Sequence, residues 1–179
     1  GAANDWLALA MVDGYAFSES WASLIFAMFL AIMTFVRLLS ARLRMHWSSE
    51  NILRVLLAGG SVGLGLVAFA PHPALALAGV ALWAAGAALI FPTGGSALSN
   101  EPAMTAARMS VLVSINYIAV LVGPPLLGMI AEDFGYHRAL LFLVPPVTLG
   151  IYLARYVRED TLESGSVVPV AHTRQEKAA

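Results

Sequence analysis

The chain has 179 residues, of which 59% are hydrophobic and only 12% charged, and its formal net charge is −1. A soluble domain carries about 25% charged residues, so this composition leaves too little polar surface to cover a water-facing globule. Cysteine is absent, which excludes disulfides and thiolate metal sites, and the four histidines lack ligand-like spacing. No basic cluster with interleaved aromatic residues suggests a nucleic-acid partner. We therefore expect an integral membrane protein that holds neither a metal nor a cofactor.

The first twelve residues, GAANDWLALAMV, are apolar and helix-like. They are too short to cross a bilayer core, which needs about 20 residues. The loop DGYAFSES follows, ending in serines that favour the start of a helix. Residues 1–12 are thus expected to form half of a membrane helix, and an opening in mid-helix suggests that something is missing upstream. A positively charged leader with a cleavage site is lacking, so this segment does not resemble a signal peptide.

Five later runs are long enough to span a bilayer at about 1.5 Å of rise per residue: 21–39, 52–70, 74–91, 109–130 and 139–157. The connector Pro71-His72-Pro73 is so short that the spans beside it must be antiparallel neighbours. The predicted fold is all-α, a polytopic membrane helix bundle over residues 1–158 with five full transmembrane helices and an amino-terminal half-helix. Residues 159–179 are polar and rich in small residues, which predicts a disordered cytoplasmic tail.

Basic residues are distributed unevenly between the two sides of this bundle. When the connectors alternate between sides, Arg138 is the only one of the ten Lys and Arg residues on the side that carries DGYAFSES. The opposite side holds Arg37, Arg42, Arg44 and Arg54 together with the basic residues of the later connector and the tail. Since cytoplasmic loops are enriched in Lys and Arg, this side and the carboxyl terminus are expected to be cytoplasmic.

Glycines recur at spacings that favour close contact between membrane helices. Gly59 and Gly63 lie four residues apart, and small residues also recur around Gly79 and Gly86. Such spacing lets two helix backbones approach and gain van der Waals contact, which drives association where lipid is as apolar as leucine. A tightly packed bundle is the prediction.

Two proline pairs fall inside the predicted spans, Pro124-Pro125 after Gly123 and Pro145-Pro146. Each proline deletes a backbone donor, and in a membrane bundle neighbouring helices or polar side chains can serve the carbonyl it frees. We expect both pairs to bend or loosen their helices. The bends either allow helices to move against each other or are static kinks that only shape the contacts between helices.

Polar residues within an apolar span are costly and usually face the bundle interior or a cavity. Asp5 is open to several interpretations: binding a cation, taking part in proton coupling, capping a helix, or being solvated at a frayed terminus. Interhelical hydrogen bonding is the main expectation for Asn116 and Tyr117 in the span 109–130, with cavity lining as the alternative. The candidate substrate-pathway residues are Asn4, Asp5, Trp6, Trp83, Asn116 and Tyr117.

Catalytic signatures are missing from the sequence. It has no nucleophile-elbow pattern, no HExxH, no Walker sequence, and no pair of carboxylates at membrane depth. An enzyme is therefore not expected.

Several blocks, in order, resemble the carboxyl-terminal half of bacterial major facilitator superfamily transporters, including sugar-permease-like and drug-efflux-like members. They are GAANDW, GYAFSESWASLIFAMFLAIMT, FPTGGSALSNEPAMTAARMSV and YIAVLVGPPLLGMIAEDFG. The resemblance implies a bacterial inner-membrane protein of twelve helices in two halves, with substrate bound between them. This chain would run from the middle of helix seven through helix twelve. Asp5 and Trp6 fall where the family often has an acidic residue and a tryptophan.

The sequence departs from the family in one cytoplasmic loop. Such transporters usually carry Gly-…-Asp-Arg-x-Gly-Arg between helices eight and nine, where this chain reads SARLRMHWSSENILR. Ser40 stands at the first glycine and residues 45–49 replace the acidic and basic core, although Arg37, Arg42 and Arg54 survive. Asn116 also stands where the family favours a small residue.

Two functional hypotheses remain open on the sequence. The first is the carboxyl-terminal half of a secondary active small-molecule transporter that uses alternating access, inactive as an isolated chain. The second is a non-transporting membrane bundle, either a vestigial fragment or a half-carrier that needs a partner chain or a second copy. The substrate is not specified, because aromatic, amide and hydroxyl groups suit sugars, amphiphiles and many drugs alike.

Overall fold

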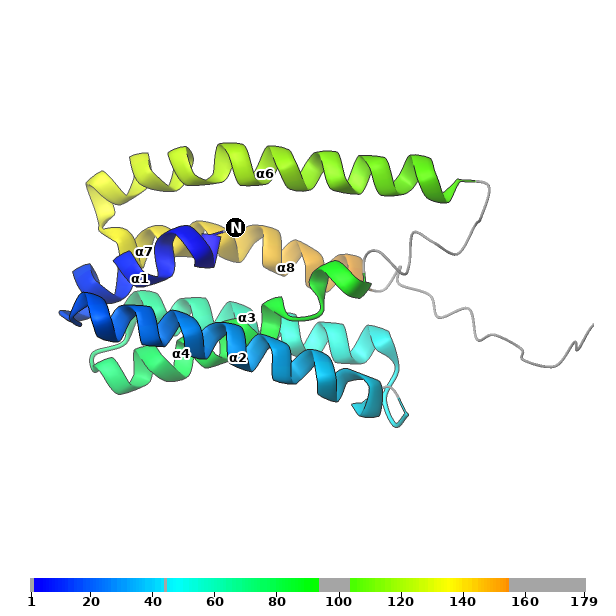
Figure 1. Ribbon diagram of the computed structural model, residues 1–179, viewed down its shortest axis with the longest axis horizontal. Coiled ribbons are helices and arrows are strands. Elements are labelled where there is room, and N and C mark those ends of the chain that lie inside the picture. The colour runs from blue at the N-terminus through cyan, green and yellow to red at the C-terminus, as the bar shows by residue number, and fades with distance from the viewer. Residues whose placement is uncertain (1, 44, 94–103, 155–179) are drawn as a thin grey trace, which may run out of the picture.

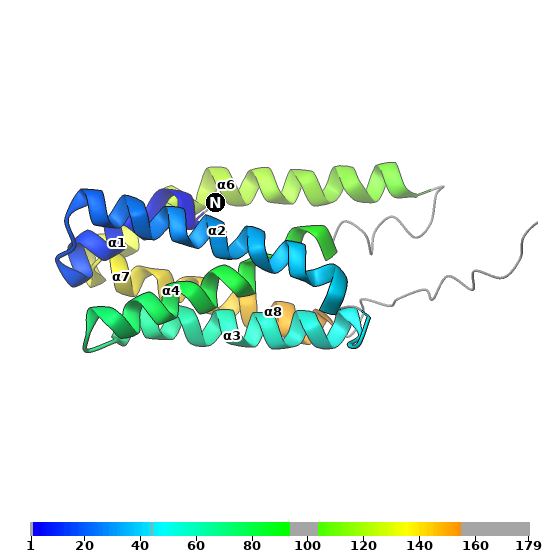
Figure 2. The same ribbon diagram turned by 60° about the horizontal axis from the view of Figure 1, so that its bottom comes forward.

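The computed structural model describes residues 2–43, 45–93 and 104–154, and this part of the chain forms only helices and short turns. Helices α1 to α4 and α7 to α8 lie together as a bundle, while α6 runs alongside, set apart over most of its length (Figures 1 and 2). The all-α prediction is confirmed. The elements are α1 (Ala2–Tyr15), α2 (Glu19–Leu43), α3 (Ser49–Phe69), α4 (Pro73–Ala87), α6 (Thr105–Phe134), α7 (Tyr136–Ala139), the 3-10 helix η1 (Leu140–Leu143) and α8 (Val144–Leu153).

Within the described residues five stretches are long and apolar enough to cross a membrane, which confirms the expectation of five full spans. The short α1, with 14 residues, is the additional half-helix. Residues 155–179, which hold the end of the last predicted span and the predicted tail, lie outside the described residues. The five stretches are Glu19–Ser40, Ser49–Phe69, Pro73–Thr93, Thr105–Phe134 and Tyr136–Leu153.

Local signals set several helix ends. The Ser48 side chain accepts a hydrogen bond from the Asn51 backbone N–H and caps the start of α3. Pro73 occupies the first turn of α4, where a missing N–H costs nothing. Gly135, with φ of 82°, separates α6 from α7, a backbone conformation that glycine adopts without steric cost.

The two proline pairs have different local consequences. Helix α6 is continuous through Pro124 and Pro125, so that pair does not end the helix. In the last span the chain adopts a 3-10 turn before Pro145, which lies in the first turn of α8. Because Pro145 cannot donate to the Leu141 carbonyl, the tighter turn is needed for the Val144 N–H to reach that carbonyl instead.

Helices α3 and α4 touch backbone to backbone through glycine. A Cβ atom on Gly63 would lie 2.5 Å from the Gly79 carbonyl oxygen, and one on Gly86 would lie 2.6 Å from the Gly60 Cα. The expected pairing of Gly59 with Gly63 is corrected to Gly60 with Gly63, since a Cβ on Gly59 would meet nothing within 4 Å. Residues three apart in a helix share a face, so Gly60 and Gly63 both face α4, whereas Gly59 does not.

The end of α1 is fixed to two other connectors. The Tyr15 hydroxyl donates to the Val67 carbonyl at 2.7 Å. That carbonyl has no helical donor, because the residue four positions on is Pro71. The Asp13 carboxylate accepts from the Tyr136 backbone N–H at 3.3 Å and lies 4.0 Å from the His137 Nδ1 atom. These contacts gather the α1–α2, α3–α4 and α6–α7 connections at one end of the bundle.

We predict that Gly63→Ala destabilises the bundle by about 1–3 kcal/mol, because the new methyl group would collide with α4 backbone atoms that cannot rotate away. The matched control is Gly65→Ala in the same helix, where a Cβ would meet nothing within 4 Å. That change should leave stability unaltered or raise it by up to about 1 kcal/mol. Unfolding by sodium dodecyl sulfate in mixed micelles measures both, and equal effects would contradict the glycine contact.

We predict that Tyr15→Phe lowers the free energy of unfolding by about 1 kcal/mol, since it removes the hydroxyl that serves the Val67 carbonyl. Tyr117→Phe is the control, because Tyr117 is 68% exposed, and it should change stability by less than about 0.5 kcal/mol. The same mixed-micelle unfolding measures both variants. A Tyr15→Phe variant as stable as the parent would show that water or another group replaces the bond.

Candidate functional site

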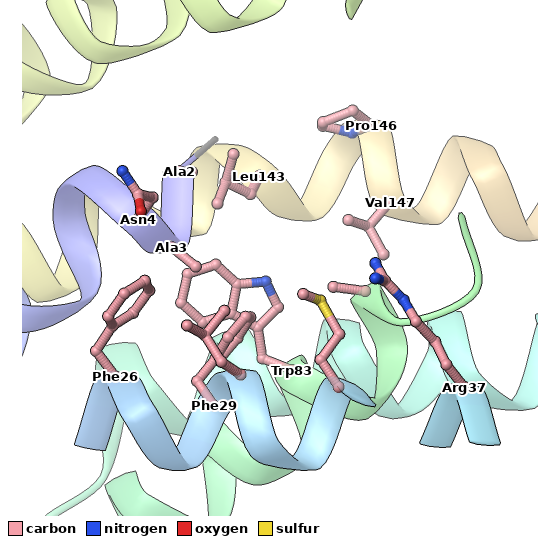
Figure 3. Close-up of a pocket in the computed structure, with 13 residues that line it drawn as sticks. Ala2, Ala3, Asn4, Phe26, Phe29, Arg37, Trp83, Leu143, Pro146 and Val147 are labelled. Carbon is pink, nitrogen blue, oxygen red and sulfur yellow. The ribbon is translucent and has the colours of Figure 1, made fainter. Parts of the chain in front are cut away.

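Two open cavities formed by the described residues are large enough to hold a small molecule. The first has a volume of about 370 Å³ and is enclosed by α1, α2, α4, η1 and α8 (Figure 3). Ligand pockets in proteins range from about 300 to 1,000 Å³, so it is large enough for a small organic molecule. The residues that give it chemical character are Asn4, Phe26, Phe29, Arg37, Trp83 and Pro146.

The aromatic part of the first cavity lies near the middle of two candidate membrane spans. Phe29 stands near the middle of the span Glu19–Ser40, and Trp83 stands at the middle of the span Pro73–Thr93. Their rings contact each other edge to face, with centroids 5.1 Å apart and planes inclined by 69°. Such contacts hold aromatic rings in fixed orientations. The pair therefore forms a rigid aromatic wall, and the Trp83 indole nitrogen faces the middle of the cavity (Figure 3).

Arg37 stands at the opposite end of the first cavity from Asn4 (Figure 3). Its Nε atom donates to the Ala88 carbonyl at 2.9 Å. That carbonyl is free because the residue four positions on, Pro92, has no N–H to offer. The Arg37 carbonyl in turn accepts from the buried Ser40 hydroxyl at 2.6 Å. Pro92 thus leaves the Ala88 carbonyl available, and the bond to that carbonyl holds Arg37 of α2 in place.

The second cavity, of about 520 Å³, lies between α6 and the η1–α8 segment. Asn116 supplies the polar side chain among the described lining residues, and Gly123 and Pro124 of α6 also line the cavity. The two cavities share three lining residues, Ala2, Leu143 and Pro146, so they adjoin at the start of α1.

The structure brings only some of the predicted pathway residues to these cavities. Asn116 and Tyr117 are exposed, and neither bonds to another described residue, so the expected interhelical hydrogen bonds are not found in the described part of the chain. Asn4 and Trp83 line the first cavity and Asn116 the second, whereas Asp5, Trp6 and Tyr117 line neither.

Asp5 and Trp6 have other surroundings. Asp5 is exposed and accepts a hydrogen bond from the Asn4 amide at 3.2 Å. Trp6 stacks on Tyr136, with ring centroids 5.6 Å apart, and lies close to Gly128 of α6. Its ring therefore fills the junction of α1, α6 and α7. The indole Nε1 atom of Trp6 is buried without a partner among the described residues.

The predicted cytoplasmic arginines differ in their contacts. Arg54 pairs with Glu50 one turn earlier in α3, at 2.7 Å on a partly exposed surface. Arg42 is exposed at the end of α2, and Arg44 lies outside the described residues. Arg37 reaches a cavity instead, which sequence reasoning missed because it assigned all four to a loop. The signal was present in the sequence: Arg37 falls within a span, where a charge indicates a function.

The described residues contain no group of three or more His, Asp or Glu side chains that could hold a metal ion. The chemistry that the cavities offer is an apolar and aromatic surface with a few polar groups. These are a guanidinium, two amides and an indole N–H, all placed by helices. Such an arrangement binds and orients small molecules.

Comparison with known proteins places these helices in a family. The model of the Major Facilitator Superfamily matches residues 3–178. The chain is 29% identical over 145 residues to "Membrane protein MosC" of Rhizobium meliloti, covering 80% of this chain and 36% of that protein. It is also 29% identical over 157 residues to "Uncharacterized transporter y4wD" of Sinorhizobium fredii (strain NBRC 101917 / NGR234), covering 82% and 42%.

The chain therefore spans about two fifths of the length of these curated relatives. No solved structure matches it. The family match extends over nearly all of the sequence and agrees with the membrane-spanning helices and with the resemblance of the sequence blocks. The chain belongs to the Major Facilitator Superfamily of membrane transporters.

Proposed function

We propose that this chain forms the carboxyl-terminal half of a secondary active transporter for a small molecule, and that the transporter works by alternating access. The observation that carries the proposal is the aromatic cavity beside Phe29 and Trp83 at the middle of their spans. Secondary transporters bind substrate near the bilayer midplane, at the interface of two repeats.

The exposed face of α6 supports a facing half. Only Leu127 and Ala131 of this helix are buried, and both lie near its carboxyl end. The second cavity opens beside the rest of the helix, at Asn116 and Pro124. Because the relatives are more than twice as long as the matched region, we propose that their additional helices supply the other wall of the substrate path.

We propose that the end of the bundle with Arg42 and Arg54 faces the cytoplasm and that the end with His72 faces outward. The α2–α3 connector lies at the former end, and the α1–α2, α3–α4 and α6–α7 connections lie at the latter (Figure 1). The sidedness of Lys and Arg in the sequence supports this orientation. The membrane would be the bacterial inner membrane.

A second candidate, a bundle that does not transport, is favoured by the loop after α2. The family's acid–base motif is replaced there by residues 45–49. Arg54, which survives, is engaged with Glu50 inside its own helix. In such transporters the acidic and basic residues of this loop hold neighbouring helices together in one closed state. A loop that lacks them would fail to do so, as expected of a vestigial protein or of a half-carrier with another partner.

We predict that the chain reconstituted alone in liposomes transports neither glucose nor ethidium, because one wall of the path is missing. Flux above that of protein-free liposomes would contradict this proposal. The two candidates are separated by the DNA directly upstream of the Gly1 codon. Six further spans encoded there in the same frame would favour the transporter half, whereas six spans that are out of frame or in a separate reading frame would favour the second candidate, as a broken or two-part carrier.

We predict that a membrane-impermeant maleimide added to intact cells labels His72→Cys and does not label Arg42→Cys until the membrane is opened. Both native residues are exposed, and the chain has no cysteine of its own, so each variant carries a single target. The reverse pattern of labelling would invert the proposed orientation. Labelling after permeabilisation is the control for reactivity at each site.

A further inference from the structure

We propose that the first cavity binds an amphiphilic anion, with the oxyanion on the guanidinium of Arg37 and the apolar body against Phe29 and Trp83. The inference deepens the proposed function, on which it rests, by naming the class of ligand. It requires a guanidinium that is fixed, has free donors and lacks a protein counter-ion, together with an apolar surface within the same cavity.

The guanidinium is fixed and still has donors to offer. Its Nε atom is engaged by the Ala88 carbonyl at 2.9 Å, which holds the plane of the group at the cavity wall. Neither terminal nitrogen bonds to any described residue. Those two nitrogens carry the pair of N–H groups that arginine uses to bind a carboxylate or phosphate end on.

The charge of Arg37 has no protein counter-ion among the described residues. None of the described residues that line the cavity is acidic, and Arg37 is the sole charged residue among them. The nearest acidic side chain along α1, Asp5, lies outside the lining and bonds to Asn4. The guanidinium is partly buried, and a charge that is partly withdrawn from water is stabilised by an opposite charge, so an anion bound from outside the chain would lower the free energy of the site.

The remainder of the cavity is suited to an apolar body. Its wall is made of the Phe29–Trp83 pair, with Phe26, Leu30 and Met33 beside it on α2. The volume of about 370 Å³ admits a ring with a short chain. Apolar surface buried there contributes affinity, and the charge on Arg37 selects the sign of the ligand.

Three probes of the same size and different charge test the proposal: cyclohexanecarboxylate, cyclohexylmethanol and cyclohexylmethylamine. Each is measured in radiolabelled form by equilibrium dialysis against the chain in phosphatidylcholine nanodiscs, with empty nanodiscs subtracted. We expect the carboxylate to bind at least tenfold more tightly than the alcohol, and the amine most weakly. This comparison needs no variant, so it does not depend on a mutant that folds.

Arg37→Gln should remove the preference for the carboxylate, lowering its affinity at least tenfold while changing that of the alcohol far less, because glutamine can still donate to Ala88 but carries no charge. Arg42→Gln is the matched control, an exposed arginine of the same helix outside the lining, and it should keep the preference. Circular dichroism of each variant checks that helix content is retained. Loss of the preference in both variants would assign it to general charge and overturn the proposal.

A solute carboxylate and an anionic lipid headgroup share this chemistry, and a second arm separates them. Carboxylate binding is measured in nanodiscs that contain phosphatidylglycerol and compared with binding in phosphatidylcholine nanodiscs. Both are measured in high salt, which screens the surface potential. If phosphatidylglycerol lowers carboxylate binding to the parent and not to Arg37→Gln, the anion site is supported and its ligand is a lipid headgroup. If carboxylate binding to the parent is unchanged, the anion site is supported and its ligand is a solute.

The failure of this inference can be told apart from failure of the proposed function. Equal binding of the carboxylate and the alcohol, or a preference that survives in Arg37→Gln, overturns the anion site and leaves a neutral-ligand cavity. If none of the three probes binds above empty nanodiscs, the anion site is overturned and the proposed function loses its main support.

Discussion

A bilayer core supplies no water to backbone carbonyls, so a carbonyl that a proline frees is stabilised when another group of the protein donates to it. In this chain three such carbonyls have identifiable donors. The Tyr15 hydroxyl serves Val67, which lies four residues before Pro71. The Arg37 Nε atom serves Ala88, which lies four residues before Pro92. A 3-10 turn serves Leu141 before Pro145. These donors bind α1 to α3 and α2 to α4, so the prolines that interrupt helices also determine how the helices are joined.

The cavity follows from the same arrangement. Helices α3 and α4 are in close contact at Gly63 and Gly79. One turn after Gly79, the Trp83 ring points toward α2 and contacts Phe29. The bond from Arg37 to the proline-freed carbonyl of α4 holds a guanidinium at the far end of the same space. An arginine that holds α2 to α4 thereby also lines the cavity. Membership in a transporter family makes such a space in the middle of the spans a natural place for substrate.

The sequence predicted the number of spans because apolar length alone decides it. It predicted that glycines would bring helices together, and it could not tell which ones, because the run GGSVGLG offers several spacings and only helix rotation selects Gly60 over Gly59. The donors to the freed carbonyls were beyond its reach, since Arg37 lies 51 residues from Ala88 and Tyr15 lies 52 from Val67. Trp83 is predicted as a cavity residue from its place near the middle of a span, whereas Arg37 lies near the end of the run 21–39, where apolar length alone does not separate the helix from the connector.

The account depends most on lipid as the solvent of the outer helix faces. Val62 tests this directly, since it lies near the middle of α3 and is 59% exposed in a chain that has no cysteine. A nitroxide attached to Val62→Cys in reconstituted membranes can be relaxed by oxygen, which concentrates in lipid, or by a water-soluble nickel chelate. The account predicts strong relaxation by oxygen and little by nickel. Strong relaxation by nickel, with little by oxygen, would place this face in water and contradict the membrane bundle.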